Sequence, residues 1–126
     1  MPKTSKETAS QVVDLGVMES RSEQFDGYIA EFTTFREDAD GTPVFKGLPD
    51  DRCSCPHWGF VFKGKLTFTS GDRQEVFEAG DAFYVAPGHT PKAVAGSEFV
   101  QFSPSEELKE VDEAMAKNMQ AMMQGA

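Results

Sequence analysis

Residues 57–89 read HWGFVFKGKLTFTSGDRQEVFEAGDAFYVAPGH and contain the pattern that decides the fold. Short runs rich in Phe, Val and Thr are separated by Gly, Pro and Asp, which is typical of strands joined by tight turns. The strands expected here are His57–Lys63, Lys65–Thr69, Gln74–Phe77 and Ala82–Val85, with a hairpin turn at Ser70–Arg73. Such a series predicts an antiparallel sandwich or barrel.

The same pattern continues on both sides of this stretch. From Phe25 onward, apolar and polar residues alternate through Thr33, which indicates a strand, and Glu37–Pro43 supplies a turn. Further short strands are expected at Val44–Lys46, Cys53–Cys55 and Phe99–Phe102. We therefore expect an all-β fold, with the barrel occupying residues 25–103.

The residues after the barrel follow a helical period. Ser103-Pro104-Ser105-Glu106 resembles a capping box, with a hydroxyl at the cap and Pro at the first helical position. An apolar stripe then recurs at steps of three and four residues: Leu108, Val111, Met115, Met119 and Met122. The pattern predicts a C-terminal α-helix over 104–126, whose stripe covers the open face of the barrel or an identical neighbour. A ligand-facing role for the methionines is the alternative.

The N-terminal residues 1–24 are polar and of mixed charge, with one apolar segment between Val12 and Met18. We expect them to form an arm with a single anchoring segment. At 126 residues the chain has room for one compact domain. The expected organisation is thus an N-terminal arm over 1–24, a barrel over 25–103 and a helix over 104–126.

Charge and hydropathy exclude several classes of partner. The net charge is −9, which repels the phosphate backbone and argues against nucleic acid and anionic membranes. No apolar run exceeds the five residues from Ala82 to Ala86, whereas a membrane helix needs roughly 20. Since the first ten residues also lack the apolar stretch of a secretory signal, we expect a cytoplasmic protein.

From Val44 to Phe102 the sequence resembles the cupin superfamily. The first cupin motif ends in a glutamate, six further residues and a glycine, and His57 and Gly64 have that spacing. The second motif begins with Gly-Asp and ends in a Pro, Gly and His cluster, which matches Gly80-Asp81 and Pro87-Gly88-His89. The resemblance implies a small single-domain jelly-roll β-barrel with divergent metal-binding motifs.

The positions that hold a metal in typical cupins carry other residues here. The usual ligands are a His-x-His pair, a glutamate and a histidine of the second motif. By the resemblance, these positions fall on Asp51, Cys53, His57 and Pro91, and the terminal asparagine of the second motif falls on Ala95. The usual cupin metal site therefore cannot be transferred to this chain.

A different set of candidate ligands lies in the same region. On a continuous strand Cys53, Cys55 and His57 would share one face, and His89 lies in the neighbouring second-motif loop. Two thiolates and two imidazoles suit Zn²⁺ or another transition metal. The alternative is ordinary packing, because free cysteines are often buried as small hydrophobes and Pro56 interrupts the strand.

The two cysteines also raise the questions of a disulfide and of a nucleophilic pair with a histidine. A disulfide between residues two apart on an extended segment would be strained, so we expect both cysteines to be free thiols. A cysteine and a histidine could form a nucleophilic pair, but no third residue that would orient them is evident in the sequence.

The sequence favours a barrel that binds a small molecule in its cavity, with or without a transition metal. The candidates for the cavity lining are Phe60, Phe62, Phe68, Phe77, Phe83, Tyr84 and Phe102, of which half must point outward because the strands alternate. A metal-dependent enzyme of the oxygenase or isomerase type, acting on a small organic substrate, is the alternative, and a purely structural barrel is a third. The sequence leaves enzymatic activity and the identity of the ligand open. It also predicts a homodimer through the Tyr28–Phe35 strand and the Met-rich helix.

Overall fold

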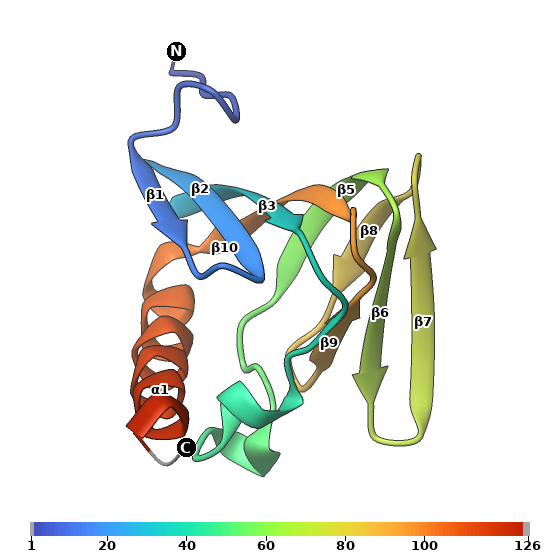
Figure 1. Ribbon diagram of the computed structural model, residues 1–126. Coiled ribbons are helices and arrows are strands. Elements are labelled where there is room, and N and C mark those ends of the chain that lie inside the picture. Colours follow the sequence, from blue (N-terminus) through green and yellow to red (C-terminus); the bar gives the residue numbers. More distant parts are fainter. Residues whose placement is uncertain (1, 125–126) are drawn as a thin grey trace.

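Two antiparallel sheets face each other in the computed structural model, which describes residues 2–124 (Figure 1). The six-stranded sheet has the order β1 (Gln11–Asp14), β2 (Met18–Phe25), β3 (Tyr28–Phe35), β10 (Glu98–Pro104), β5 (His57–Lys63), β8 (Ala82–Val85). The four-stranded sheet has the order β4 (Ala39–Asp40), β9 (Thr90–Ala93), β6 (Lys65–Ser70), β7 (Arg73–Glu78). A C-terminal helix, α1 (Ser105–Gln124), follows β10. This architecture confirms the predicted all-β jelly-roll barrel with a C-terminal helix.

Alternating side chains build the space between the sheets. On β5, His57 and Val61 are buried while Trp58 and Phe60 are exposed, as a strand with one face in the core requires. The buried apolar residues of both sheets form one core cluster: Val61, Leu66, Phe68, Phe83, Val85, Ala93 and Phe99. The inward side chains of the Phe-rich strands therefore fill the part of the barrel interior that this core cluster occupies.

The two predicted glycine turns occur where the sequence places them. Gly64 has a φ of +78° and joins β5 of one sheet to β6 of the other. A Cβ there would lie 2.4 Å from the hydroxyl oxygen of Ser97, so glycine is required on both counts. At the tip of the β6–β7 hairpin, Ser70 pairs with Arg73 and Gly71 has a φ of +63°.

The N-terminal arm is the largest departure from the sequence prediction. Residues 11–25 form β1 and β2, and β2 pairs with β3 along its whole length, from Met18↔Phe35 to Phe25↔Tyr28. The prediction was wrong because polar residues on a sheet with a solvated face were interpreted as a tail. The missed signal is Asp26-Gly27, both with positive φ, which forms the tight turn between β2 and β3.

The connection before β5 also differs. The expected strand Val44–Lys46 is the 3₁₀ helix η1 (Thr42–Phe45), because Pro43 fixes a helical φ near its start. The expected strand Cys53–Cys55 is replaced by a loop after a second 3₁₀ turn, η2 (Pro49–Asp51), and only Cys53 makes a bridge.

Strand β9 was not expected, because Pro91 lies within it and the residues around it were interpreted as a turn. Pro91 is tolerated at this position although Pro cannot donate a hydrogen bond to a strand ladder.

Helix α1 begins one residue later than the capping-box prediction. Pro104 is still the last residue of β10, and Ser105 donates its backbone N–H to the carbonyl of Gly27 (2.8 Å). Leu108 and Val111 pack into a second core cluster with Phe45, Cys53 and Cys55. The first half of the apolar stripe thus covers one end of the barrel, as one of the two predicted alternatives required, whereas Met122 is exposed. Residues 125–126 of the predicted helix lie outside the described residues.

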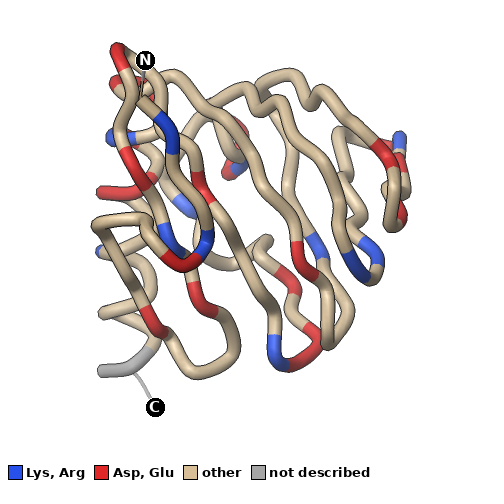
Figure 2. Tube along the Cα trace, turned by 90° about the horizontal axis from the view of Figure 1, so that it is seen from above, with Lys and Arg blue, Asp and Glu red and all other residues tan. Residues whose placement is uncertain are grey.

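Charged residues avoid much of the barrel wall. Figure 2 shows Lys, Arg, Asp and Glu gathered on the N-terminal hairpin, the loops and the β6–β7 hairpin, with long uncharged stretches of strand between them. Within residues 2–124, no helix has the length and apolar character that crossing a membrane would demand.

Candidate metal centre

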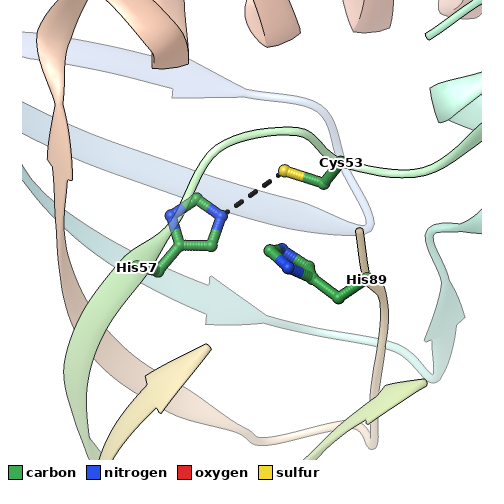
Figure 3. Close-up of side chains that lie close together, drawn as sticks. All are labelled: Cys53, His57 and His89. Atoms are coloured by element: carbon green, nitrogen blue, oxygen red, sulfur yellow. Dashed lines mark hydrogen bonds between the residues drawn. The ribbon is translucent and has the colours of Figure 1, made fainter. Parts of the chain in front are cut away.

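Three of the four predicted ligands lie together inside the barrel. The candidate ligand atoms of Cys53, His57 and His89 are all within 4.8 Å of one another. The three side chains are 2%, 5% and 2% exposed, respectively. Figure 3 shows them converging from two directions, Cys53 and His57 from the segment that leads into β5 and His89 from the loop before β9. We call these three residues the Cys-His-His cluster.

Backbone hydrogen bonds hold two members of the cluster side by side. The N–H of Cys53 donates to the carbonyl of His89 (2.8 Å), and the N–H of Gly88 donates to the carbonyl of Cys53 (2.7 Å). Gly88 has a φ of +96°, a conformation that glycine adopts without strain, and so turns the chain immediately before His89. The isolated bridge between Cys53 and His89 therefore fixes the spacing of their side chains.

The third member is placed by the start of β5. His57 is the first residue of this strand and its side chain faces the interior. Its Nε2 atom lies 3.5 Å from the sulfur of Cys53, and the two histidine rings have centroids 5.0 Å apart at 65°. Because β5 lies between β10 and β8, and His57 pairs with Val85 of β8, the sheet fixes the position of His57.

Second-sphere hydrogen bonds leave one nitrogen of each histidine free to face the cluster. The Nδ1 of His89 lies 2.7 Å from the carbonyl oxygen of Ala86, which only accepts, so this nitrogen carries the proton. The Nδ1 of His57 is paired with the hydroxyl of Ser103 at 2.7 Å. Metal-binding histidines are typically oriented in this way, with the outer nitrogen donating and Nε2 available as a ligand.

Cys55 does not join the cluster. It is fully buried, its sulfur lies 3.4 Å from the carbonyl oxygen of Pro56, and it packs with Leu108 and Val111 under helix α1. The prediction that it shares a face with Cys53 and His57 was wrong, since residues 53–56 are not a strand and the alternation does not apply. Cys55 still contacts the hydroxyl of Ser103, the partner of His57.

Burial makes every member of the cluster neutral at pH 7. Burial is the main reason why the pKa of Cys53 is raised to about 11, and the carboxylates of Asp112 and Glu31 make smaller contributions in the same direction. Burial lowers the pKa of His57 to about 3, with a smaller contribution from His89. The pKa of His89 is also lowered by burial. Neutral imidazoles need lose no proton to bind a metal, whereas Cys53 must release one.

The donor set fits a thiophilic transition metal. Zn–S and Zn–N bonds of about 2.3 and 2.0–2.1 Å at tetrahedral angles place sulfur and nitrogen roughly 3.5 Å apart. The separation of 3.5 Å between Cys53 sulfur and His57 Nε2 equals one edge of such a site. With no metal bound, the same pair forms a thiol–imidazole hydrogen bond, so the arrangement is stable in either state.

The candidate lining residues divide between the two faces of the strands, as the expected alternation requires. Phe68, Phe77 and Phe83 point inward and pack ring against ring, with centroids 5.1 to 5.9 Å apart. The other four are on the outside, 38–53% exposed: Phe60, Phe62, Tyr84 and Phe102. The alternation along each strand separates the two sets, so the inward rings fill the barrel and the outward ones are on its wall.

Polar residues give the interior a more open side. Glu31 and Gln101 occupy paired positions on the inner face of β3 and β10, and both remain partly exposed. Ser20 and Gln101 donate to the two carboxylate oxygens of Glu31, at 2.8 and 2.9 Å. The negative charge of Glu31 also raises the pKa of Cys53, so this carboxylate influences the electrostatics of the cluster.

The sequence analysis missed Ser103, Glu31 and Gln101 as parts of this region. Ser103 was interpreted as a helix cap, and no local pattern identifies it as the partner of a residue 46 positions away. Glu31 lies within an alternating strand, where a polar residue normally faces solvent. Their roles follow from the pairing of β3, β10 and β5.

The structure is similar to several solved structures, one of which is described as a cupin. An RmlC-like cupin from Shewanella frigidimarina has 18% sequence identity and a TM-score of 0.59, over 80% of this chain and 87% of that one. KdgF from Halomonas sp. has 18% identity and a TM-score of 0.55, over 75% and 86%. The polyketide cyclase RemF from Streptomyces resistomycificus has 12% identity and a TM-score of 0.60, over 82% and 79%.

These similarities show that the jelly-roll barrel has the cupin fold. The resemblance inferred from the two sequence motifs is confirmed at the level of the fold. No protein-family model matches the sequence, and no curated protein is similar to it in sequence.

Proposed function

We propose that this protein binds Zn²⁺ or another thiophilic transition metal through Cys53, His57 and His89, and binds a small molecule at the metal. The observation that carries the proposal is the convergence of three buried donor atoms within 4.8 Å, with a free imidazole nitrogen from each histidine. A buried thiolate favours Zn²⁺ and similar metals over Mg²⁺ or Ca²⁺.

Three protein ligands leave a coordination position for a further molecule. Structural zinc sites usually have four protein ligands, whereas sites that bind a substrate or water keep one position open. A metal held here would act as a Lewis acid toward a donor oxygen or nitrogen of the ligand. The chain itself holds His89 in one tautomer, excludes bulk water from the donors and offers the polar side chains of Glu31 and Gln101 on the more exposed side.

A metal-dependent enzyme, of the oxygenase or isomerase type that acts on a small organic substrate, is the second candidate. The open coordination position favours it, and one structural neighbour is described as a polyketide cyclase. The two candidates differ in outcome: a binding protein returns its ligand unchanged, whereas an enzyme converts it. Mass spectrometry of candidate ligands after incubation with the metal-loaded protein separates them.

The quaternary structure and location are part of the same proposal. We infer a homodimer that works in the cytoplasm, where Cys53 and Cys55 remain reduced and Cys53 is available as a ligand. The predicted interface needs revision, because β3 lies inside the sheet between β2 and β10 and leaves no free edge.

The two cysteines supply a matched experiment for the metal site. We expect untagged protein to bind one Co²⁺ or Zn²⁺ per chain, and its Co²⁺ spectrum to show a thiolate charge-transfer band. Cys53→Ser removes the band and lowers affinity by more than about 100-fold, since a ligand contributes more than the supporting residues do. Cys55→Ser, an equally buried thiol outside the cluster, retains both.

The opposite outcomes refute the metal proposal. Absence of stoichiometric binding by the folded wild-type protein would show that the cluster is a hydrogen-bonded part of the core. Equal loss of affinity in the two cysteine variants would show that the effect is not ligation by Cys53. Circular dichroism of each variant ensures that folded proteins are compared.

A further inference from the structure

The outer wall of the six-stranded sheet carries an uninterrupted group of exposed aromatic side chains. Six of them are 38–53% exposed: Tyr28, Trp58, Phe60, Phe62, Tyr84 and Phe102. Trp58 pairs in register with both Tyr84 and Phe102, and residues in register share a face. We call these six residues the aromatic face.

Ring contacts connect the members of the aromatic face. Trp58 lies 5.1 Å from Tyr84 and 6.5 Å from Tyr28 between ring centroids, and Phe60 lies 5.5 Å from Phe62. Val100, which pairs with Phe60 on the same face, is only 8% exposed. The rings therefore cover this part of the sheet as one group of Tyr28, Trp58 and Tyr84 and one pair of Phe60 and Phe62.

The exposed area is comparable to the largest apolar patch that a typical monomer leaves in water. At roughly 200 Å² per aromatic side chain, the six expose on the order of 500 Å². The largest apolar patch of a typical monomer is about 300–600 Å² and is often functional. Two such faces in contact would bury on the order of 1,000 Å² from the rings alone, close to the roughly 1,200–2,000 Å² of a specific interface.

The distribution of charge around the aromatic face indicates which kind of partner fits it. The outward positions of β5, β8 and the centre of β10 carry no charge, although the chain has a net charge of −9. Two copies with this charge repel each other least when they meet through a surface without charges. A basic protein would instead find no acidic residue on this face to pair with, and an anionic lipid surface would find no lysine or arginine.

The edge of the face has the composition of an interface rim. β2 borders it with Glu19 and Arg21, which form an ion pair at 2.6 Å, and Glu98 lies near Lys63 at 4.0 Å. An apolar centre with a polar, internally paired border is typical of protein–protein contacts. A second copy of the chain supplies a matching apolar centre and the same border.

We infer that the aromatic face is the contact between two copies of this chain, related by a two-fold axis. The inference supplies a surface for the proposed homodimer and is independent of metal binding, since the Cys-His-His cluster lies on the opposite side of β5. Trp58 would lie at the centre of the interface, and it directly follows the candidate ligand His57 on β5.

The only tryptophan of the chain makes the interface directly observable. Trp58 should be shielded in the dimer and exposed in the monomer, so its emission shifts to longer wavelength and iodide quenches it more on dilution. Sedimentation equilibrium of the same samples should give twice the chain mass of 13.8 kDa at high concentration. A wild-type protein that sediments as a monomer at tens of micromolar concentration overturns both the dimer and this interface.

Matched lysine substitutions locate the contact. Tyr84→Lys on the aromatic face should raise the dimer dissociation constant by at least about tenfold, because the charge enters the interface twice in a two-fold dimer. Val76→Lys on β7 of the other sheet replaces a side chain of similar exposure, 47% against 53%, and should leave it unchanged.

The remaining results separate this inference from the other proposals. A dimer that persists in Tyr84→Lys and dissociates in Val76→Lys would place the interface on the other sheet and refute the aromatic face. Metal content measured in the same samples should not change in either variant. Loss of the dimer with normal metal content supports the aromatic face, and loss of metal with an intact dimer counts only against the metal site.

Discussion

The two ends of the barrel interior differ in chemistry although they adjoin each other. One end is filled by apolar side chains such as Val61, Phe83 and Phe99. The other contains the Cys-His-His cluster and Ser103 beneath helix α1, and the ring of Phe68 contacts that of His89 at 5.1 Å. The apolar end stabilises the fold by burial alone, whereas the polar end requires a specific partner for every group.

This contrast indicates which residues serve stability and which serve function. Apolar side chains of similar volume could occupy the polar end without leaving donors and acceptors to satisfy. The sequence instead places two histidines at the polar end. Burial lowers the pKa of both, so they remain neutral. Buried titratable groups with perturbed pKa values are frequent at functional sites.

The largest expected effect is on stability at the apolar end. Phe83→Ala removes a ring that stacks with Phe77 and contacts Phe68, and should lower the free energy of unfolding by about 3–5 kcal/mol in urea titrations. Val76→Ala, an exposed apolar residue, should change it by less than about 0.5 kcal/mol. Similar small losses in both variants would show that Phe83 does not belong to a tightly packed core.

A second prediction tests whether the two ends act separately. Zn²⁺ at 100 to 1,000 times its dissociation constant should stabilise the protein by about 3–4 kcal/mol, since it binds only the folded state. Phe83→Ala should keep this gain, because the ring does not belong to the cluster, and Cys53→Ser should lose it. Thermal melts with Zn²⁺ and with a chelator measure the stabilisation by Zn²⁺ in both variants. If Zn²⁺ still stabilises Cys53→Ser, Cys53 is not a ligand of the metal.

A third prediction concerns acid and the metal-free protein. Burial lowers the pKa of His57 from 6.5 to about 3, so below pH 6.5 the unfolded chain binds a proton that the folded chain does not. This contribution to stability is complete above pH 6.5 and is lost as the pH falls toward 3. At pH 4.5 the loss amounts to roughly 2–3 kcal/mol.

The variant His57→Gln isolates that contribution from the other titrating groups. Urea unfolding at pH 7 and pH 4.5, in chelator, should show a smaller loss for His57→Gln than for the wild type. Equal losses would mean that His57 is protonated in the folded protein and is not buried as neutral imidazole.

The smallest effect is expected when the hydroxyl group that is hydrogen-bonded to the candidate ligand His57 is removed. Ser103→Ala removes the partner of His57 Nδ1 and should weaken metal binding by about 10- to 100-fold while retaining the Co²⁺ charge-transfer band. Ser105→Ala is a suitable control, because the hydroxyl of Ser105 is buried without a hydrogen-bond partner among the described residues. Unchanged affinity in Ser103→Ala would indicate that the packing around His57 is sufficient to orient it.

The strands from β5 to β8 could be predicted because their signals are local. Alternation places His57 inward and Trp58 outward, and Gly64 and Gly71 occupy turns that need positive φ. The N-terminal strands were missed because their side chains are mostly polar or half exposed, and the Asp26-Gly27 turn was the only sharp signal. A strand at a sheet edge carries little hydrophobic pattern of its own.

By itself, the sequence determined the cupin-like barrel, the C-terminal amphipathic helix and the residue types of a thiophilic site. Only the tertiary structure decided which of those residues meet. Cys55 was excluded and His89 included because backbone hydrogen bonds join Cys53 to His89, whereas Pro56 and the loop before β5 abolish the alternation that would have linked the two cysteines. The aromatic face and the pairing of Ser103 with His57 likewise depend on strand order. Local patterns fix which way a side chain points, but contacts between distant segments depend on register, which is set by the whole sheet.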